Sequence, residues 1–362
     1  MQIKSIQVLR AIAFIGVFLW HTEKGIVKGT GNWGVCIFFI LSGFLLTIRH
    51  YEDGSNNKGS SIQESFRFAI KRVSKLYPFH IAMMLFTVPF ELMREDNNVV
   101  RFLLRATANV CLVQSWIPND TYFWSFNWVA WYLSSYLFLL FLFPVLMKYI
   151  GRFKYFIFDI ILVFLIQVLT SGILNHILID NHVCETFPLY WFVYINPVFR
   201  LGDFIIGMCL GLFYIKNTHK ERKVDKVGAT VMEVVWLCMV CFVFIFVQNE
   251  PIPFETWWSR TQLYIPVSTF TVWVFAANRG VITEFLVQKL FVRVGDLSVY
   301  GFLTHQVVIR YCNKIFERLS IYNTAFIISM EFILVMASAL VAERIVLVLG
   351  YGKDKRIMAV HK

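Results

Sequence analysis

Two ionisable side chains, Arg10 and His21, interrupt the apolar stretch that opens the chain. Ionisable groups are unfavourable at membrane depth, so each one marks a candidate functional site. A separation of eleven helical residues is about three turns plus 20°, which places both side chains on one helix face, roughly 16 Å apart along the axis. A guanidinium and an imidazole on that face could line one passage. The structural alternative is an interfacial histidine and an arginine that extends to the lipid headgroups.

The composition is that of an integral membrane protein. Of the 362 residues, 58% are hydrophobic and 16% are charged, whereas a soluble domain is about one-quarter charged. We expect an all-α, polytopic membrane helix bundle, formed by a single domain over residues 1–362 with its core at 5–349 and no appended soluble domain. The net charge of +11 indicates basic loops beside anionic lipid headgroups. We therefore expect a lipid bilayer as partner and no nucleic acid.

About ten apolar segments are predicted to be transmembrane helices, because each is close to the ~20 residues that cross a bilayer. They cover residues 5–22, 33–49, 76–93, 127–149, 154–174, 197–215, 229–248, 261–277, 297–313 and 323–349. Residues 101–117 begin with basic side chains and are predicted to be a re-entrant or interfacial segment. Most Lys and Arg residues outside the spans then fall on the side of the N-terminus, which predicts that both termini are cytoplasmic.

A second motif, GVCIFFILSGFL, follows at residues 34–45. Together with the Arg10–His21 pair it resembles the opening of the acyltransferase-3 family, which are mostly bacterial membrane O-acetyltransferases that act on cell-surface carbohydrates. The resemblance implies that His21 is the working base or an acyl-carrying nucleophile. It also implies that Arg10 orients the donor or stabilises negative charge, and it makes Ser42 a further site candidate.

The segment 62–80 between the second and third spans is amphipathic and basic, which by itself predicts a helix along the inner interface. The family has a basic motif that ends in proline at this point. Arg72 and Pro78 match it, whereas Lys75 replaces the usual second arginine. The resemblance implies that Lys71, Arg72 and Lys75 bind the phosphates of cytoplasmic acetyl-CoA, since cations are good phosphate ligands.

Two later blocks follow in the family's order. Arg200 and Asp203 stand three residues apart, so they can pair on one helix face. A structural ion pair is the alternative to a functional site there. His305 stands near the middle of the span 297–313 and is either a working side chain or a packed, hydrogen-bonded one. The resemblance makes these three residues further site candidates.

The resemblance implies an O-acetyltransferase of the plasma (inner) membrane. It would move an acetyl group from acetyl-CoA to a hydroxyl of a cell-surface polysaccharide, such as O-antigen, or of its lipid-linked precursor. The residues leave two other classes open: a transporter of a small or glycan-related substrate, and a non-catalytic scaffold or receptor. No second copy of the 10–43 pattern occurs, which disfavours a transporter built from repeats. The absence of HExxH and similar motifs predicts no metal, and the sequence does not predict the oligomeric state.

Overall fold

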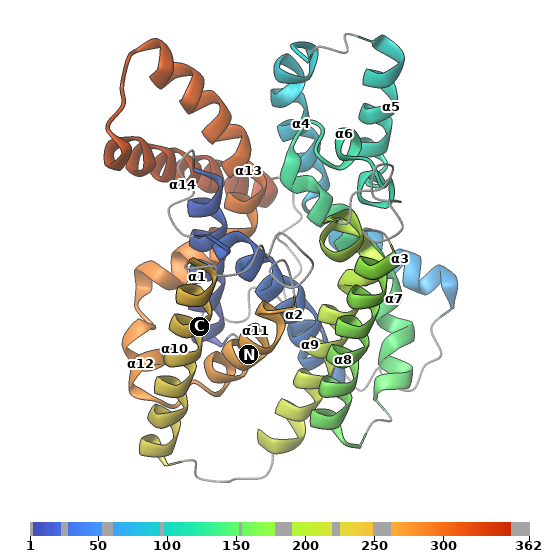
Figure 1. Cartoon of the computed structure of the whole chain (residues 1–362), viewed down its shortest axis with the longest axis vertical. Coiled ribbons are helices and arrows are strands. Elements are labelled where there is room, and N and C mark those ends of the chain that lie inside the picture. The colour runs from blue at the N-terminus through green and yellow to red at the C-terminus, as the bar shows by residue number, and fades with distance from the viewer. Residues whose placement is uncertain are drawn as a thin grey trace.

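The computed structural model describes residues 3–22, 28–52, 61–94, 98–151, 154–177, 190–218, 225–248 and 262–348. Within these ranges the regular elements are helices, and none is a strand. The α-helices are α1 (Lys4–His21), α2 (Thr30–Glu52), α3 (Ile62–Val73), α4 (Tyr77–Leu92), α5 (Val99–Val110), α6 (Asp120–Phe123), α7 (Trp131–Ile150), α8 (Phe156–Asn175), α9 (Pro197–Thr218), α10 (Lys226–Gln248), α11 (Tyr264–Ala277), α12 (Val281–Leu286), α13 (Lys289–Arg318) and α14 (Thr324–Val348). Figure 1 shows their arrangement.

Each predicted span coincides with one helix: α1, α2, α4, α7, α8, α9, α10, α11, α13 or α14. Among the described residues, 6 helical stretches are by themselves long and apolar enough to cross a membrane, and they contain α2, α7, α8, α9, α10 and α14. Of the other four, α4 and α11 are short, with 16 and 14 residues, and α1 and α13 carry more polar side chains. The protein is therefore a polytopic helical membrane protein, while the count of ten and the cytoplasmic termini stay predictions.

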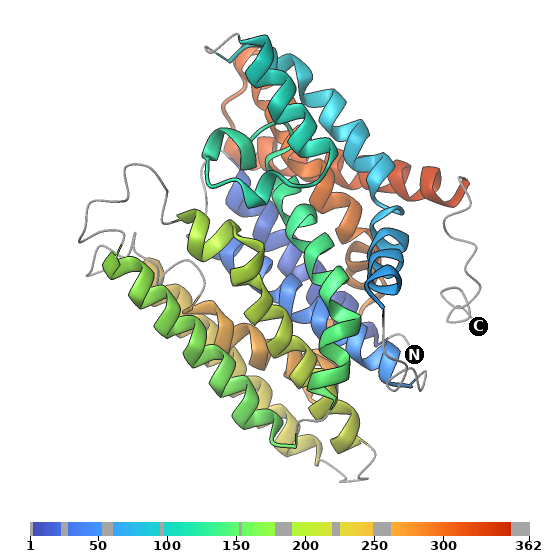
Figure 2. The same ribbon diagram turned by 90° about the vertical axis from the view of Figure 1, so that its right-hand side faces the viewer.

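The first two helices form the centre of the bundle (Figure 1). Helix α1 packs against α2, α11 and α13, and α2 packs against α9 and α11 as well. By contrast, α8, α10 and α14 leave most of their apolar side chains exposed. Helices α8 and α10 line one side of the molecule in Figure 2. An apolar surface that faces outward is what lipid covers in a membrane protein.

Glycines allow the central helices to approach closely. A Cβ atom at Gly207 of α9 would collide with the carbonyl oxygen of Ile40 in α2. A Cβ at Gly295 of α13 would likewise collide with the carbonyl oxygen of Gln7 in α1. Small residues at such crossings let two backbones touch, which favours association of helices in lipid. Helix α9 therefore approaches α2 closely at Gly207.

The amphipathic segment 62–80 forms two helices, not one. Helix α3 begins with a capping box between Ser61 and Glu64, and a turn separates its end from α4. Pro78 lies in the first turn of α4, where its missing N–H is tolerated but where it cannot continue a helix from before. The proline therefore sets the break, and α3 packs on α7 as a separate helix.

Candidate active site

Two histidines from opposite ends of the chain meet at one end of the bundle. Nε2 of His305 in α13 lies 3.3 Å from Nδ1 of His21, the last residue of α1. Nδ1 of His21 is also 2.8 Å from the carbonyl oxygen of Val17, and Nδ1 of His305 is 2.8 Å from that of Phe302. A carbonyl oxygen can only accept a hydrogen bond, so both Nδ1 atoms carry the ring protons. Nε2 of His305 then accepts from Nδ1 of His21.

This tautomer leaves the lone pair of His21 on Nε2. Within the described residues no hydrogen bond is made to that nitrogen, and the side chain keeps partial exposure. An imidazole that is fixed through one nitrogen and open at the other is the form required of a general base or a nucleophile. The sequence nominated both histidines separately, and the structure brings them together.

Arg10 lies further along α1 and faces other polar groups of the bundle. Its Nη1 donates a hydrogen bond to Oε1 of Gln7 at 3.3 Å. The guanidinium lies within electrostatic range of one carboxylate and three phenols, those of Asp296, Tyr132, Tyr136 and Tyr300. Arg10 therefore faces α7 and α13, and it does not extend to the lipid headgroups.

Ser42 lies near two of these phenols. Its hydroxyl donates to the carbonyl oxygen of Phe38 at 2.7 Å, and the phenols of Tyr132 and Tyr136 are close enough to interact with it. The two tyrosine rings are stacked, with centroids 6.0 Å apart. We call the set Arg10, Ser42, Tyr132 and Tyr136 the inner polar cluster. All four side chains are half-buried, so they keep surface that a ligand can contact.

Aromatic rings connect the histidine pair to the inner polar cluster. The Phe302 ring lies 5.7 Å from that of His305 and 5.1 Å from that of Tyr132, measured between centroids. Phe38 packs at 5.8 Å from Phe302 on the same side. A continuous line of contacts therefore runs from His21 through α13 and α7 to Ser42.

Arg72 continues this line at the opposite end of the bundle. Its Nη2 lies 3.0 Å from Nε2 of His50, its guanidinium carbon lies 3.6 Å from the centroid of the Phe68 ring, and it is within electrostatic range of Tyr136 and Arg49. Burial lowers the pKa of Arg72 below its ordinary value, and the nearby charge of Arg49 acts in the same direction. An arginine remains protonated at neutral pH despite such a change.

The other two predicted phosphate ligands are placed differently. Lys71 is exposed, and Lys75 is half-buried in the turn that follows α3. Arg72 turns instead toward the end of α2, where it meets His50 and Arg49. Neither residue was predicted from the sequence to be a site residue, although Arg49 ends a predicted span and His50 follows it directly, where a cation reaches the interface.

Arg200 and Asp203 form the predicted ion pair, with 2.8 Å between Nη1 and Oδ2. Both side chains are fully buried. Nε of Arg200 also donates to the carbonyl oxygen of Tyr194 at 2.7 Å. The ring of Phe39 stands between this pair and the inner polar cluster, with its centroid 5.4 Å from the guanidinium carbon and 4.5 Å from the ring of Tyr132. The pair therefore joins α9 to its neighbours and does not line the polar cluster.

Tyr132 and Tyr136 are candidate site residues that were not predicted from the sequence. They stand four apart on α7, a spacing that puts two side chains on one helix face. That spacing was the available signal. It was weak, because tyrosines are common in membrane proteins at the interface.

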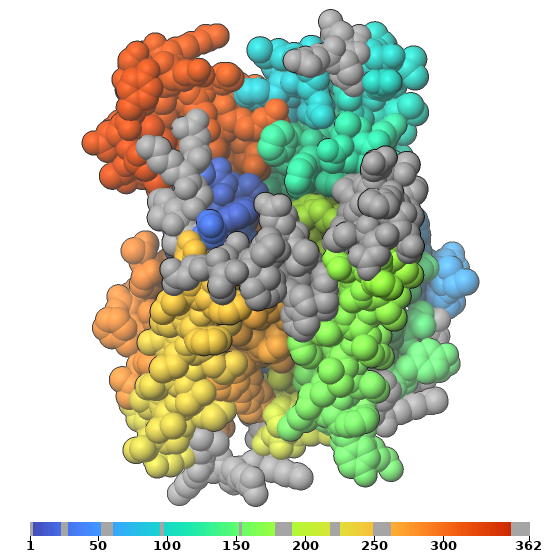
Figure 3. Space-filling view, in the orientation of Figure 1, coloured from blue at the N-terminus to red at the C-terminus, as the bar shows by residue number. Residues whose placement is uncertain are grey.

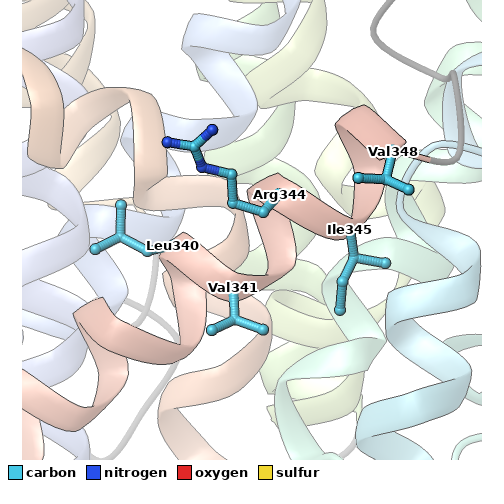
Figure 4. A pocket seen from close by; sticks show the side chains of 5 residues that line it. All are labelled: Leu340, Val341, Arg344, Ile345 and Val348. Atoms are coloured by element: carbon cyan, nitrogen blue, oxygen red, sulfur yellow. The ribbon is translucent and has the colours of Figure 1, made fainter.

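A shallow apolar hollow on α14 lies apart from these residues. It is lined by Leu340, Val341, Arg344, Ile345 and Val348. Figure 4 shows Arg344 directed to one side of the helix and Val341 and Ile345 to the other. None of the predicted site residues lines this hollow, so it does not belong to the histidine pair.

Comparison with known families decides the protein class. A family model described as an acyltransferase domain matches residues 3–343. The chain belongs to the acyltransferase-3 family. The matched range contains every site candidate named above.

Curated proteins similar to this chain carry corresponding names. A protein of Staphylococcus aureus (strain COL) named "Putative O-acetyltransferase" is 24% identical over 332 residues, which are 84% of this chain and 50% of that protein. The peptidoglycan O-acetyltransferase OatA of Listeria monocytogenes is 30% identical over 128 residues, 34% of this chain and 20% of its own. The acyltransferase MdmB of Streptomyces mycarofaciens is 23% identical over 315 residues, 83% of this chain and 73% of its own.

The chain spans about half the length of the first curated relatives that it matches, at 50% coverage. No solved structure matches the chain.

Proposed function

We propose that this acyltransferase-3 protein is an O-acetyltransferase of the plasma (inner) membrane. It transfers the acetyl group of acetyl-CoA to a hydroxyl of a cell-surface polysaccharide or of its lipid-linked precursor. The observation that carries the proposal is that Nδ1 of His21 lies against the carbonyl oxygen of Val17 and Nε2 of His305, which leaves Nε2 of His21 with a lone pair. The names of the relatives, two of which are O-acetyltransferases, support acetyl as the group transferred.

The donor is bound at the end of the bundle that carries Arg72. Phosphate oxygens prefer charge-assisted hydrogen bonds from guanidinium groups, and Arg72 and Arg49 lie together there. Lys71 and Lys75 of the same segment add positive charge around them. The acetyl-bearing arm of the cofactor then extends along Tyr136 and Tyr132 toward the histidine pair. In this position Arg10 orients the donor, because it stands roughly 16 Å along α1 from His21 and is too far away to stabilise charge at the reacting carbonyl.

Nε2 of His21 is the reacting nitrogen. As a general base it takes the proton of the acceptor hydroxyl while that oxygen attacks the thioester carbonyl. The carbon–sulfur bond then breaks, and the proton passes from the imidazolium to the departing thiolate of CoA. As a nucleophile, Nε2 attacks the thioester carbonyl, the carbon–sulfur bond breaks and CoA leaves as the thiolate. The acceptor oxygen then attacks the acetyl group on Nε2, its proton passes to the thiolate, and the nitrogen–acetyl bond breaks to restore the neutral imidazole. In both routes His305 holds the reactive tautomer of His21 and does not touch the acetyl group.

The function is tested on surface polysaccharide from cells with the wild-type protein, with the His21→Ala variant and without the gene. NMR measures the base-labile O-acetyl groups. Acetyl present only with the wild-type protein supports the reaction and the role of His21. Equal acetyl in all three samples contradicts the proposed acceptor.

The side of donor entry is tested with sealed vesicles of one orientation and radiolabelled acetyl-CoA. Inside-out vesicles should transfer label from the outer solution, and right-side-out vesicles should not. Transfer by right-side-out vesicles contradicts a cytoplasmic donor site.

Membership of an acyltransferase family favours an enzyme over a transporter. Uptake of a substrate without acetylation would instead favour a transporter.

A further inference from the structure

Two exposed tryptophans lie side by side at the His21 end of the bundle. Trp124 and Trp128 are each 38% exposed, and their rings are stacked with centroids 6.5 Å apart and planes 26° from parallel. Tyr190 packs against Trp124, with 5.4 Å between the ring centroids. We call these three residues the aromatic ledge. Aromatic rings have an apolar body and a negative face, and the exposed part of such a ring suits the C–H face of a sugar ring.

Cationic side chains stand beside the aromatic ledge. The guanidinium carbon of Arg310 lies 5.0 Å from the centroid of the Trp128 ring, and its Nη1 donates to the carbonyl oxygen of Phe126 at 3.0 Å. Arg94 donates to the carbonyl oxygen of Trp124 at 3.4 Å and keeps 32% of its side chain exposed. A ligand on the indole faces therefore lies within reach of two positive charges.

A buried carboxylate holds this arrangement in place. Oε1 of Glu91 accepts from the backbone N–H of Phe126 at 2.9 Å and lies 3.5 Å from Nη1 of Arg94. Oε2 of the same carboxylate lies 3.8 Å from Nε of Arg105. Arg310 is within electrostatic range of both Glu91 and Arg94. Glu91 therefore contacts the guanidinium groups of Arg94 and Arg105 and lies within electrostatic range of that of Arg310.

The loop that carries the tryptophans is fixed to the helix of the histidine pair. Asn127 donates a hydrogen bond from Nδ2 to the carbonyl oxygen of Leu303 at 2.8 Å, two residues before His305. Phe126 has a φ of 53°, an unfavourable conformation for a bulky residue, and such strain concentrates at ligand-binding sites. A tryptophan of an interfacial aromatic belt needs only an exposed position at the membrane–water interface. These rings are held instead by a buried network that is anchored beside His305.

We propose that the aromatic ledge binds a sugar ring that carries an anionic substituent, as a part of the acceptor. The indole faces receive the ring, and Arg310 and Arg94 bind the carboxylate or phosphate that it carries. The inference rests on the proposed function only in taking the acceptor to be a glycan, and it narrows that acceptor to an acidic one. In the space-filling view the teal-green surface around α6 and the blue surface of α1 are on the same face (Figure 3).

Binding is measured on the purified full chain in nanodiscs of zwitterionic lipid. The probes are tetragalacturonic acid against its neutral methyl ester, and N-acetylglucosamine 1-phosphate against N-acetylglucosamine, which separate a carboxylate from a phosphate. Wild-type protein should bind the better acidic probe about tenfold more tightly than its neutral partner. Trp128→Ala should weaken binding of both members of that pair about tenfold. Arg310→Gln should remove the preference for the acidic member.

Trp116→Ala is the matched control, because Trp116 is also exposed, at 40%, and lies outside the ledge. It should leave both affinities unchanged. A Trp128→Phe variant, which keeps a ring, should recover part of the affinity and shows that loss in Trp128→Ala does not come from unfolding. Unchanged binding in the Trp128→Ala and Trp124→Ala variants overturns the proposal. Equal binding of acidic and neutral probes overturns it as well.

A lipid-binding role is the competing outcome. If the ledge variants change only the affinity for phosphatidylglycerol vesicles, the ledge belongs to an interfacial belt and the proposal is wrong. The measurement needs no acyl transfer, so it can fail separately from the proposed function. Acetyl transfer to a neutral acceptor without binding of either acidic probe would overturn the inference alone. Binding that depends on the ledge, without acetyl transfer to any glycan, would overturn the proposed function alone.

Discussion

The imidazoles of His21 and His305 are 284 residues apart in the sequence and 3.3 Å apart in the structure, from Nδ1 to Nε2. His21 is the last residue of α1, and His305 lies within α13. Their hydrogen bond, together with the carbonyl partners of both Nδ1 atoms, fixes one tautomer of each ring. In the proposed mechanism His305 is therefore a positioning residue, and His21 is the residue that reacts.

Replacing His305 by alanine should lower kcat about 10- to 100-fold, because His21 loses the acceptor that helps hold its ring. The KM for acetyl-CoA should stay within about twofold, since His305 does not contact the donor phosphates. Steady-state kinetics with labelled acetyl-CoA measure both quantities. His305→Gln, whose amide oxygen can accept the same hydrogen bond, should recover part of kcat. An equal loss of kcat in His305→Ala and His305→Gln would contradict the role of His305 in positioning His21.

Arg72→Ala should raise the KM for acetyl-CoA about tenfold, because it removes the inward-facing guanidinium at the proposed phosphate site. Arg72→Lys should recover only part of the affinity, since a lysine lacks the planar fork. Lys71→Ala is the control on the same helix. Because the Lys71 side chain is exposed, this substitution should change the KM for acetyl-CoA by less than about twofold. Donor binding in detergent provides the measurement. A larger effect at Lys71 than at Arg72 would place the phosphates on the outside of α3.

Tyr136→Phe keeps the ring that stacks on Tyr132 but removes the hydroxyl that lines the proposed donor path. We expect a folded protein whose kcat/KM for acetyl-CoA falls about 3- to 10-fold, the size of one lost hydrogen bond. Tyr149→Phe on the same helix is the control, because Tyr149 is 55% exposed. Wild-type kinetics in Tyr136→Phe would exclude the hydroxyl from the donor path.

Asp203→Leu should destabilise the protein by about 3–5 kcal/mol, because it leaves the Arg200 guanidinium buried without its carboxylate. The double variant Arg200→Met/Asp203→Leu should recover most of this free energy, since it removes both charges together. Chemical unfolding in detergent, monitored by tryptophan fluorescence, measures the difference in the free energy of unfolding between the variants. Activity per folded molecule should be near wild type in the double variant. Complete loss of activity in a stable double variant would assign the pair to the site.

Gly207→Ala should destabilise the protein by about 1–3 kcal/mol, because its Cβ would collide with the backbone of α2 at Ile40. Gly228→Ala is the control, since no heavy atom lies within 4 Å of the Cβ position there. That substitution should be neutral or slightly stabilising, as alanine favours the helix. Thermal unfolding of both variants in the same detergent tests the pair. Equal melting temperatures would show that α2 and α9 can separate at no cost.

The sequence alone determined the features that depend on neighbouring residues. Helix positions follow from apolar length and from proline, and each predicted span became a helix with ends within a few residues, except the longer α13. Helical spacing placed Arg10 and His21 on one face and paired Arg200 with Asp203. These features are local, because a helix satisfies its backbone hydrogen bonds within its own segment in lipid.

Only the tertiary structure decided which helix faces meet. The missing side chain of Gly301 makes room for the ring of Phe14, so α13 lies against α1. His305 stands one turn beyond Gly301 and His21 two turns beyond Phe14, so this contact brings the two imidazoles together. The grouping of Arg72 with Arg49 likewise needs α3 and α2 to end at the same place. Such contacts depend on the fit of side-chain volumes between distant segments, which helical period and composition do not contain.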